Sequence, residues 1–95
     1  MYTSIIEFQL QPGKMAEAME ITEGMKPDLA QFDGIRQFIV VDKGGDAGLV
    51  LAIYDSQAKQ EAAGPKAQEL LSRLGALLAA APERKGGEVL ANEIY

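Results

Sequence analysis

Two spacings of apolar residues alternate along the chain: a period of two, typical of a strand, and a period of three to four, typical of a helix. Their order predicts a β-α-β-β-α-β domain, the split-βαβ arrangement of ferredoxin-like α+β folds. The predicted strands cover residues 2–10, 35–41, 49–54 and 88–95. The helical regions lie between the first two strands and between the last two, so we expect a four-stranded antiparallel sheet with helices on one face.

The first helical region carries a single apolar stripe. Its members recur at the spacing of a core-facing side and are Met15, Met19, Thr22, Met25 and Leu29. Pro27 lies within this pattern and is expected to kink the helix or to end its main part, because proline removes a backbone hydrogen bond.

Glycine and proline mark the other boundaries. Residues 42–47 have the composition of a hairpin loop, and Gly64-Pro65 is expected to split the second helical region. Asp55 or Ser56 is a suitable N-cap for that region, which Pro82 should end. Residues 85–87 then form the predicted loop before the last strand.

The middle strands are apolar on both faces. Val50, Ala52 and Tyr54 alternate with neighbours that are equally apolar, and the same is true of Phe38 and Val40. In a sheet with one solvent-exposed face, each strand should instead alternate between apolar and polar residues. Because two helices cover only one face, we expect the other face to be covered by a second copy of the chain.

The composition of the chain excludes several classes of partner and catalytic site. The 95 residues form one predicted domain, 1–95, with a net charge of −5 and neither cysteine nor histidine. The acidic balance argues against nucleic acid and anionic membranes as partners. Zinc sites, thiol nucleophiles and Ser-His-Asp triads lack their residues, and no signal peptide or spanning segment is apparent, so we expect a cytoplasmic protein without a cofactor. Asp42 and Asp46 flank two glycines but lack the full ligand series of a calcium loop.

Several short motifs share a characteristic order. They are Pro12-Gly13-Lys14 after the first strand, Asp33-Gly34-Ile35 at the second, Tyr54-Asp55-Ser56 after the third, Gly64-Pro65, and a leucine-rich helix ending at Pro82. Across essentially the whole chain, this pattern resembles the antibiotic biosynthesis monooxygenase-like domains of the dimeric α+β barrel superfamily. The resemblance implies a homodimer whose sheets close into a barrel, with a pocket between the sheet and the helices of each subunit.

The resemblance also implies a range of chemistry. Some members oxidise polycyclic aromatic substrates with molecular oxygen and without a bound metal or flavin, others degrade haem, and many have no known activity. This chain departs from the pattern at two places. It has Tyr54 where members often carry Trp, and it has no His near Gly64-Pro65, where members often carry one. It has no histidine to act as the axial ligand of the haem-degrading branch.

Six residues are candidate ligand contacts. Tyr54 is placed by the resemblance at the pocket, where it could hydrogen-bond a phenolic substrate; alternatively it ends a strand with its hydroxyl in water. Arg36, Glu7 and Asn92 could orient a ligand or form structural pairs at an edge or interface. Phe38 and Met19 are apolar candidates, although the methionine spacing equally fits ordinary helix packing.

The function predicted from these observations is binding of a small aromatic or polycyclic metabolite by a dimeric α+β barrel. A cofactor-independent monooxygenase is one form of it, in which the protein desolvates and stabilises an electron-rich substrate anion, with Arg36 as the stabilising cation. The alternative is a non-catalytic dimeric module that binds a metabolite or only assembles. An open cavity with converging polar groups would favour an enzyme, whereas a cavity filled by methionine and leucine would favour the module.

Overall fold

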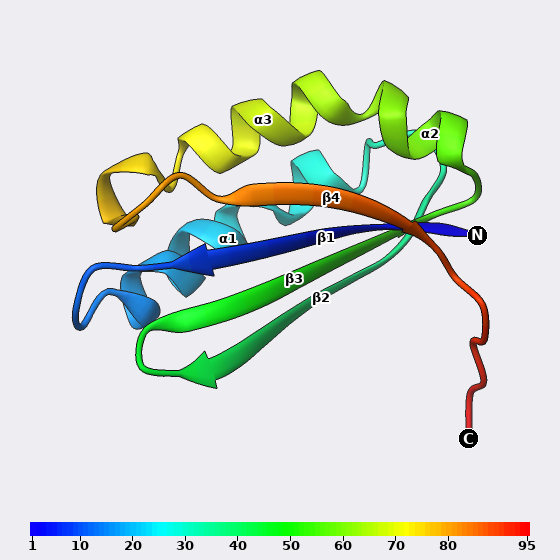
Figure 1. The fold of residues 1–95 in the computed structure, drawn as a ribbon. Coiled ribbons are helices and arrows are strands. Elements are labelled where there is room, and N and C mark those ends of the chain that lie inside the picture. Colours follow the sequence, from blue (N-terminus) through cyan, green and yellow to red (C-terminus); the bar gives the residue numbers. More distant parts are fainter.

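The computed structural model describes all residues from Met1 to Tyr95 and contains the predicted order of strands and helices (Figure 1). The elements are β1 (Tyr2–Gln9), α1 (Met15–Leu29), β2 (Ile35–Gly44), β3 (Ala47–Tyr54), α2 (Gln57–Ala62), α3 (Gly64–Ser72), the 3-10 turn η1 (Gly75–Leu77) and β4 (Glu83–Glu88). No helix is both long and apolar enough to cross a membrane.

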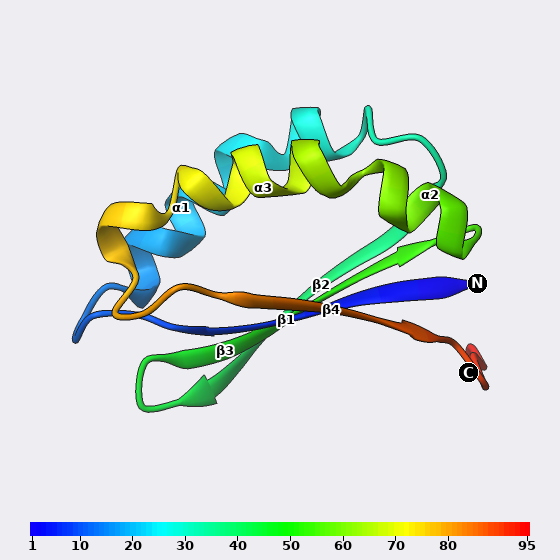
Figure 2. The same cartoon turned by 45° about the horizontal axis from the view of Figure 1, so that its top comes forward.

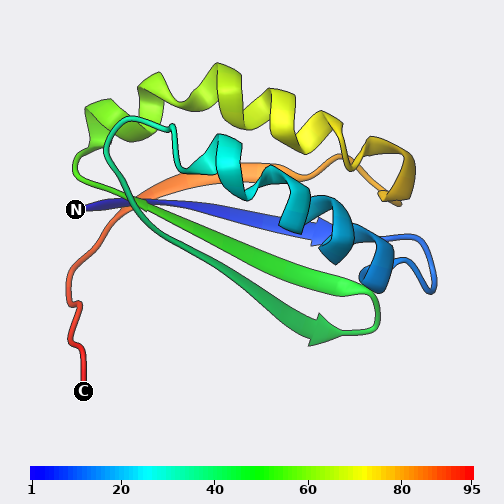
Figure 3. The same cartoon turned by 180° about the vertical axis from the view of Figure 1, so that it is seen from behind.

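The four strands form one antiparallel sheet in the order β2-β3-β1-β4. All three helices lie on the same face of this sheet, and the other face carries no element, as the views from the front, from above and from behind agree (Figures 1, 2 and 3). The predicted ferredoxin-like fold class is therefore confirmed for the single chain.

The hairpin between β2 and β3 is tighter than predicted. Pairing continues to Gly44 and resumes at Ala47, which leaves Gly45 and Asp46 as a two-residue turn. Both turn residues have positive φ, 64° and 63°. A hairpin turn of this kind follows the twist of the strands and favours glycine and aspartate, so most of the expected loop, residues 42–47, is strand.

The first helix does not end at Pro27. It includes this proline and continues to Leu29. Proline removes the backbone hydrogen bond to the carbonyl four residues earlier. Only Asp28 and Leu29 follow Pro27 in α1, so the helix ends soon after the lost bond.

The second helical region is split as predicted, by Ala63 between α2 and α3, with Pro65 in the first turn of α3. Ser56 is the N-cap of α2, and its hydroxyl accepts a hydrogen bond from the Lys59 backbone. The expectation that the helix continues to Pro82 is wrong, because α3 ends at Ser72. The segment beyond it pairs with the end of β1 instead, since Gln11 N–H donates to the Leu77 carbonyl and Ala79 N–H donates to the Gln9 carbonyl.

The position of the last strand is also wrong in the prediction. The strand is Glu83–Glu88, residues 89–95 form no strand, and the presumed loop at 85–87 lies inside β4. Gly86 pairs with Ser4, and a Cβ atom at Gly86 would lie 2.6 Å from the Tyr2 ring. The strand therefore contains glycine where a neighbouring aromatic ring covers the backbone. Beyond Val89 the chain leaves the sheet and projects away from it (Figure 1).

The core lies between the sheet and the helices and has two clusters. One is built around Met25, Phe32, Tyr54 and Leu70, and the other contains Leu10, Ala18 and Leu77. On the helix-free face of the sheet, Ile39 and Leu51 are half-buried and Val41 is 40% exposed. This face is apolar at its centre although no part of the chain covers it.

Candidate functional site: an apolar cavity with one polar end

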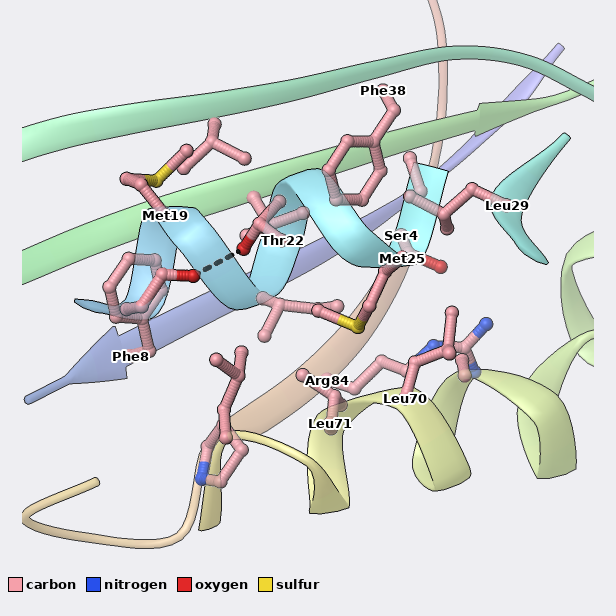
Figure 4. A pocket seen from close by; sticks show the side chains of 18 of the residues that line it. Ser4, Phe8, Met19, Thr22, Met25, Leu29, Phe38, Leu70, Leu71 and Arg84 are labelled. Atoms are coloured by element: carbon pink, nitrogen blue, oxygen red, sulfur yellow. Dashed lines mark hydrogen bonds between the residues drawn. The ribbon is translucent and has the colours of Figure 1, made fainter. Parts of the chain in front are cut away.

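A cavity of about 70 Å³ lies between the sheet and the helices α1 and α3 (Figure 4). It borders both core clusters, and 19 of its 23 lining residues are hydrophobic. Its polar side-chain groups come from Ser4, Thr22 and Arg84 and from the hydroxyl of Tyr54. The location matches the pocket expected from the resemblance.

Helix α1 forms one wall. The five residues of the stripe predicted from its spacing, from Met15 to Leu29, all line the cavity. Thr22 lies among them, and its hydroxyl donates to the Ala18 carbonyl at 2.9 Å, which satisfies this buried polar group within the helix (Figure 4). Met19, one of the six candidates, is half-buried in this wall.

The sheet forms the floor through alternate residues of each strand. One row across the sheet runs through Val40, Val50, Ile6 and Arg84, which are partners in adjacent strands, and all four line the cavity. The candidate Phe38 lies on the same face. The predicted alternation groups Phe38 with Val40 and Val50 with Tyr54, and the structure identifies this face of the strands as the helix side of the sheet.

Tyr54 closes the floor at the end of β3. Its side chain is 1% exposed and belongs to the larger core cluster, so the alternative that its hydroxyl lies in water is wrong. Burial raises the pKa of Tyr54 above its ordinary value, and the charge of the neighbouring Arg84 and a side-chain hydrogen bond with it partly oppose this rise. The phenol is therefore protonated at neutral pH and can donate a hydrogen bond.

Arg84, from β4, supplies the positive charge at this end of the cavity. Its Nη2 atom donates to the Gln60 carbonyl at 2.9 Å, while its Nε atom is buried without a hydrogen-bond partner. The other two arginines, Arg36 and Arg73, each pair with a carboxylate, and no ion pair of the chain includes Arg84. A half-buried guanidinium without an acidic partner is unusual, because buried charges are normally paired.

A second polar pair supports this arrangement. Gln60 and Ser4 are both buried, and the Gln60 side chain donates to the Ser4 hydroxyl at 3.0 Å. The Gln60 carbonyl is the group that accepts from Arg84. Gln60 of helix α2 therefore holds two strands: its backbone carbonyl binds Arg84 of β4, and its side chain binds Ser4 of β1.

Three of the six candidate residues lie elsewhere. Arg36 is exposed and pairs with Asp55, so it does not line the cavity. Glu7 is on the helix-free face, with Lys43 Nζ at 3.8 Å. Asn92 is in the exposed segment after β4, where its amide lies 4.0 Å from the Met1 sulfur.

These placements have local causes. An irregularity between Ile35 and Gln37 interrupts the pairing of β2 with β3, so the alternation that fixes Phe38 cannot be extended to Arg36. Glu7 lies on the face opposite Ile6 because adjacent strand residues point to opposite sides. Asn92 was expected in a strand that the structure places several residues earlier.

Arg84 is the site residue that the sequence did not indicate. Placing residues 85–87 in a loop moved Arg84 out of the sheet, and its charged neighbours Glu83 and Lys85 make the segment appear solvated. The available signal was the run of three charged residues, Glu83, Arg84 and Lys85, directly after Pro82, which fits an edge strand with one charged residue facing inward. No group of three His, Cys, Asp or Glu side chains is arranged to hold a metal ion.

Solved structures share this fold. A protein of unknown function from Nitrosomonas europaea, NE2512, superimposes with a TM-score of 0.80 at 18% identity, over 99% of this chain and 93% of its own. A proposed antibiotic biosynthesis monooxygenase from Bordetella bronchiseptica gives a TM-score of 0.81 at 13% identity, over 95% and 97% of the two chains. Another from Nitrosomonas europaea gives 0.78 at 14% identity, over 96% and 100%.

No family model matches the sequence, and no curated protein is significantly similar to it. At these identities, the structural likeness confirms the fold expected from the resemblance to antibiotic biosynthesis monooxygenase-like domains and leaves the reaction open.

Proposed function

We propose that the chain binds a small apolar metabolite, with an aromatic ring, in the cavity between the sheet and the helices. The observation that carries this proposal is the composition of the cavity: an apolar wall on nearly every side and two hydrogen-bond donors, Tyr54 and Arg84, at one end. Ligand sites are typically apolar with a few polar groups that fix the orientation of the ligand.

The size of the cavity sets a condition on binding. At about 70 Å³ it is smaller than an engineered cavity of about 150 Å³ that accepts benzene. An aromatic ring therefore requires lining side chains to move. Met15, Met19 and Met25 line the cavity, and the unbranched methionine side chain can change rotamer at low cost.

A cofactor-independent monooxygenase is the catalytic form of this proposal. Such a reaction needs a substrate that loses a proton and becomes an electron-rich anion, which then reduces molecular oxygen. Arg84 replaces Arg36 as the cation that stabilises the anion, since Arg84 lines the cavity and Arg36 is exposed. The surrounding apolar side chains exclude water and strengthen that interaction.

The non-catalytic module is the second candidate function, and the small volume of the cavity favours it. Three methionines and six leucines are among the 23 residues that line this small cavity, as expected when the cavity is only a packing feature. Under this alternative the chain assembles, or carries a ligand, without turnover.

A homodimer is part of both proposals. The apolar centre of the helix-free face, with Ile39, Leu51 and Val41 at least partly exposed, supports an interface there. Covering that face in an obligate dimer would bury about 2,000 Å² or more in total.

Calorimetric titration with 1-naphthol tests the binding proposal, and oxygen consumption in the same mixture tests turnover. We expect binding in the micromolar to millimolar range by the wild type. Ala67→Phe, which adds a ring at a lining position of α3, should reduce binding at least about tenfold. Gln57→Ala, on the exposed side of α2, is the matched control and should bind normally. Binding that Ala67→Phe leaves unchanged would contradict the assignment of this cavity.

A further inference from the structure

We propose that Arg84 and Tyr54 form a carboxylate subsite, so that the preferred ligand is a small aromatic acid whose ring occupies the apolar part of the cavity. This inference rests on the proposed function and specifies the chemical class of the ligand. Its basis is the incomplete pairing of Arg84: one Nη atom donates to a backbone carbonyl, the side chain hydrogen-bonds Tyr54, the buried Nε atom has no partner, and no acidic side chain pairs with the guanidinium.

The first step in the argument is the cost of an unpaired buried donor. A guanidinium has five N–H groups in a rigid fork, and each one that is buried without an acceptor loses its hydration without compensation. The Gln60 carbonyl satisfies one side of Arg84. An acceptor that entered the cavity and displaced the side chains covering Nε would satisfy this donor, and a charged acceptor would also neutralise the positive charge.

The second step is the shape of that acceptor. A carboxylate matches the guanidinium fork with two parallel hydrogen bonds, a geometry that a single phenolate oxygen cannot provide. Tyr54 adds a third donor from β3, on the other side of β1 in the sheet, because its phenol is protonated at neutral pH. A carboxylic acid is also ionised at neutral pH without assistance, whereas an ordinary phenol is not.

The third step concerns the alternative that Arg84 is only structural. A cation near the C-terminal end of α2 would interact favourably with its free carbonyls, and the bond to Gln60 has this geometry. Capping accounts for Nη2 and leaves the buried Nε unexplained. It also predicts no preference for an anionic ligand, which separates the two roles.

The test compares benzoate with benzamide, which have nearly the same shape and differ in charge. Binding is measured by NMR titration at neutral pH for the wild type, Arg84→Gln, Arg84→Lys and Arg36→Gln. We expect the wild type to bind benzoate at least about tenfold more tightly than benzamide, because charge-assisted hydrogen bonds are about twice as strong as neutral ones. Arg84→Gln should reduce this preference to less than twofold. The exposed Arg36→Gln should retain it.

Arg84→Lys keeps the charge without the fork and should show an intermediate preference, and it serves as the readout if Arg84→Gln does not fold. Equal binding of benzoate and benzamide by the wild type would overturn the inference, as would a preference that survives Arg84→Gln. If 1-naphthol binds and benzoate does not, the aromatic pocket stands and the carboxylate subsite fails. If no aromatic probe binds, the proposed function itself fails.

Discussion

At the scale of single residues, some positions in the sheet require glycine because an aromatic ring packs directly against the backbone. Gly48 in β3 faces Phe8 in β1, and a Cβ atom at Gly48 would lie 2.0 Å from the Phe8 ring. The aromatic ring therefore lies directly on the glycine backbone. Phe8 is also a lining residue, so this contact helps to fix the floor of the cavity.

Gly48→Ala is expected to destabilise the protein by about 1–3 kcal/mol, because the added methyl group must displace a packed ring. Gly24→Ala is the matched control: nothing lies within 4 Å of its Cβ position on the exposed side of α1. The control should stabilise by about 0.5–1 kcal/mol, since alanine favours the helix. Urea unfolding measures both, and equal effects of the two substitutions would refute this packing.

The raised pKa of Tyr54 makes a prediction about alkaline stability. In the unfolded chain tyrosine ionises at its ordinary value of 10.0, and in the folded protein the Tyr54 pKa is higher. The stability that neutral Tyr54 contributes is therefore complete below pH 10.0 and is lost as the pH rises through the folded pKa.

Urea unfolding from about pH 8 to pH 11 should therefore show a steeper loss of stability for the wild type than for Tyr54→Phe. The pKa of Lys59 is also raised, mainly by its hydrogen bond to Asp33, and its loss of stability falls in the same alkaline range. Because both proteins contain Lys59, that contribution cancels in the comparison. Parallel curves would show that the Tyr54 hydroxyl does not ionise differently on folding.

At the scale of secondary-structure elements, local turn chemistry was readable from the sequence and long-range pairing was not. Ser56 as an N-cap and Gly64-Pro65 as a break depend on neighbouring residues only, and both predictions are confirmed. The end of α3 and the start of β4 depend on β1, which pairs with residues near Leu77 and with the glycines of β4. A single sequence gives no information on such distant partners, so these two boundaries were misplaced.

Ser56→Ala should cost about 0.5–2 kcal/mol, because the serine hydroxyl accepts from the Lys59 backbone at the start of α2. Ser72→Ala, at the end of α3, is the comparison. Its hydroxyl donates back to the Glu69 carbonyl, a group that water can also satisfy, so we expect a change within about 0.5 kcal/mol. Thermal melting would detect the difference, and equal losses would mean that the cap adds nothing specific.

At the scale of the whole molecule, periodicity determined which residues face the helices. The α1 stripe lines the cavity, as its spacing indicated, and so do Phe38 and Tyr54, of which Tyr54 was placed at the pocket by the resemblance. The charged end of the site could not be found in the same way, because Arg84 reaches the cavity from an edge strand that the glycines of β4 obscured. The sequence therefore predicted the apolar body of the site and missed its cation.

The helix-free face leads to a prediction about assembly. Light scattering should show a dimer for the wild type at micromolar concentration, and Ile39→Lys should shift it to a monomer, because a charge at the centre of an apolar interface is left without a partner. Its half-buried position should leave the monomer fold intact by circular dichroism. Gln57→Lys, exposed on α2, should remain dimeric. A wild type that is monomeric would refute the proposed interface.

The cavity itself is tested most directly through the four methionines of the chain. Met15, Met19 and Met25 line it, whereas Met1 lies outside it and is 45% exposed. In a protein with ¹³C-labelled methionine methyl groups, titration with 1-naphthol or benzoate should shift the three lining methyl signals and leave that of Met1 unchanged. A shift confined to Met1, or no shift at saturating ligand, would contradict the assignment of this cavity as the binding site.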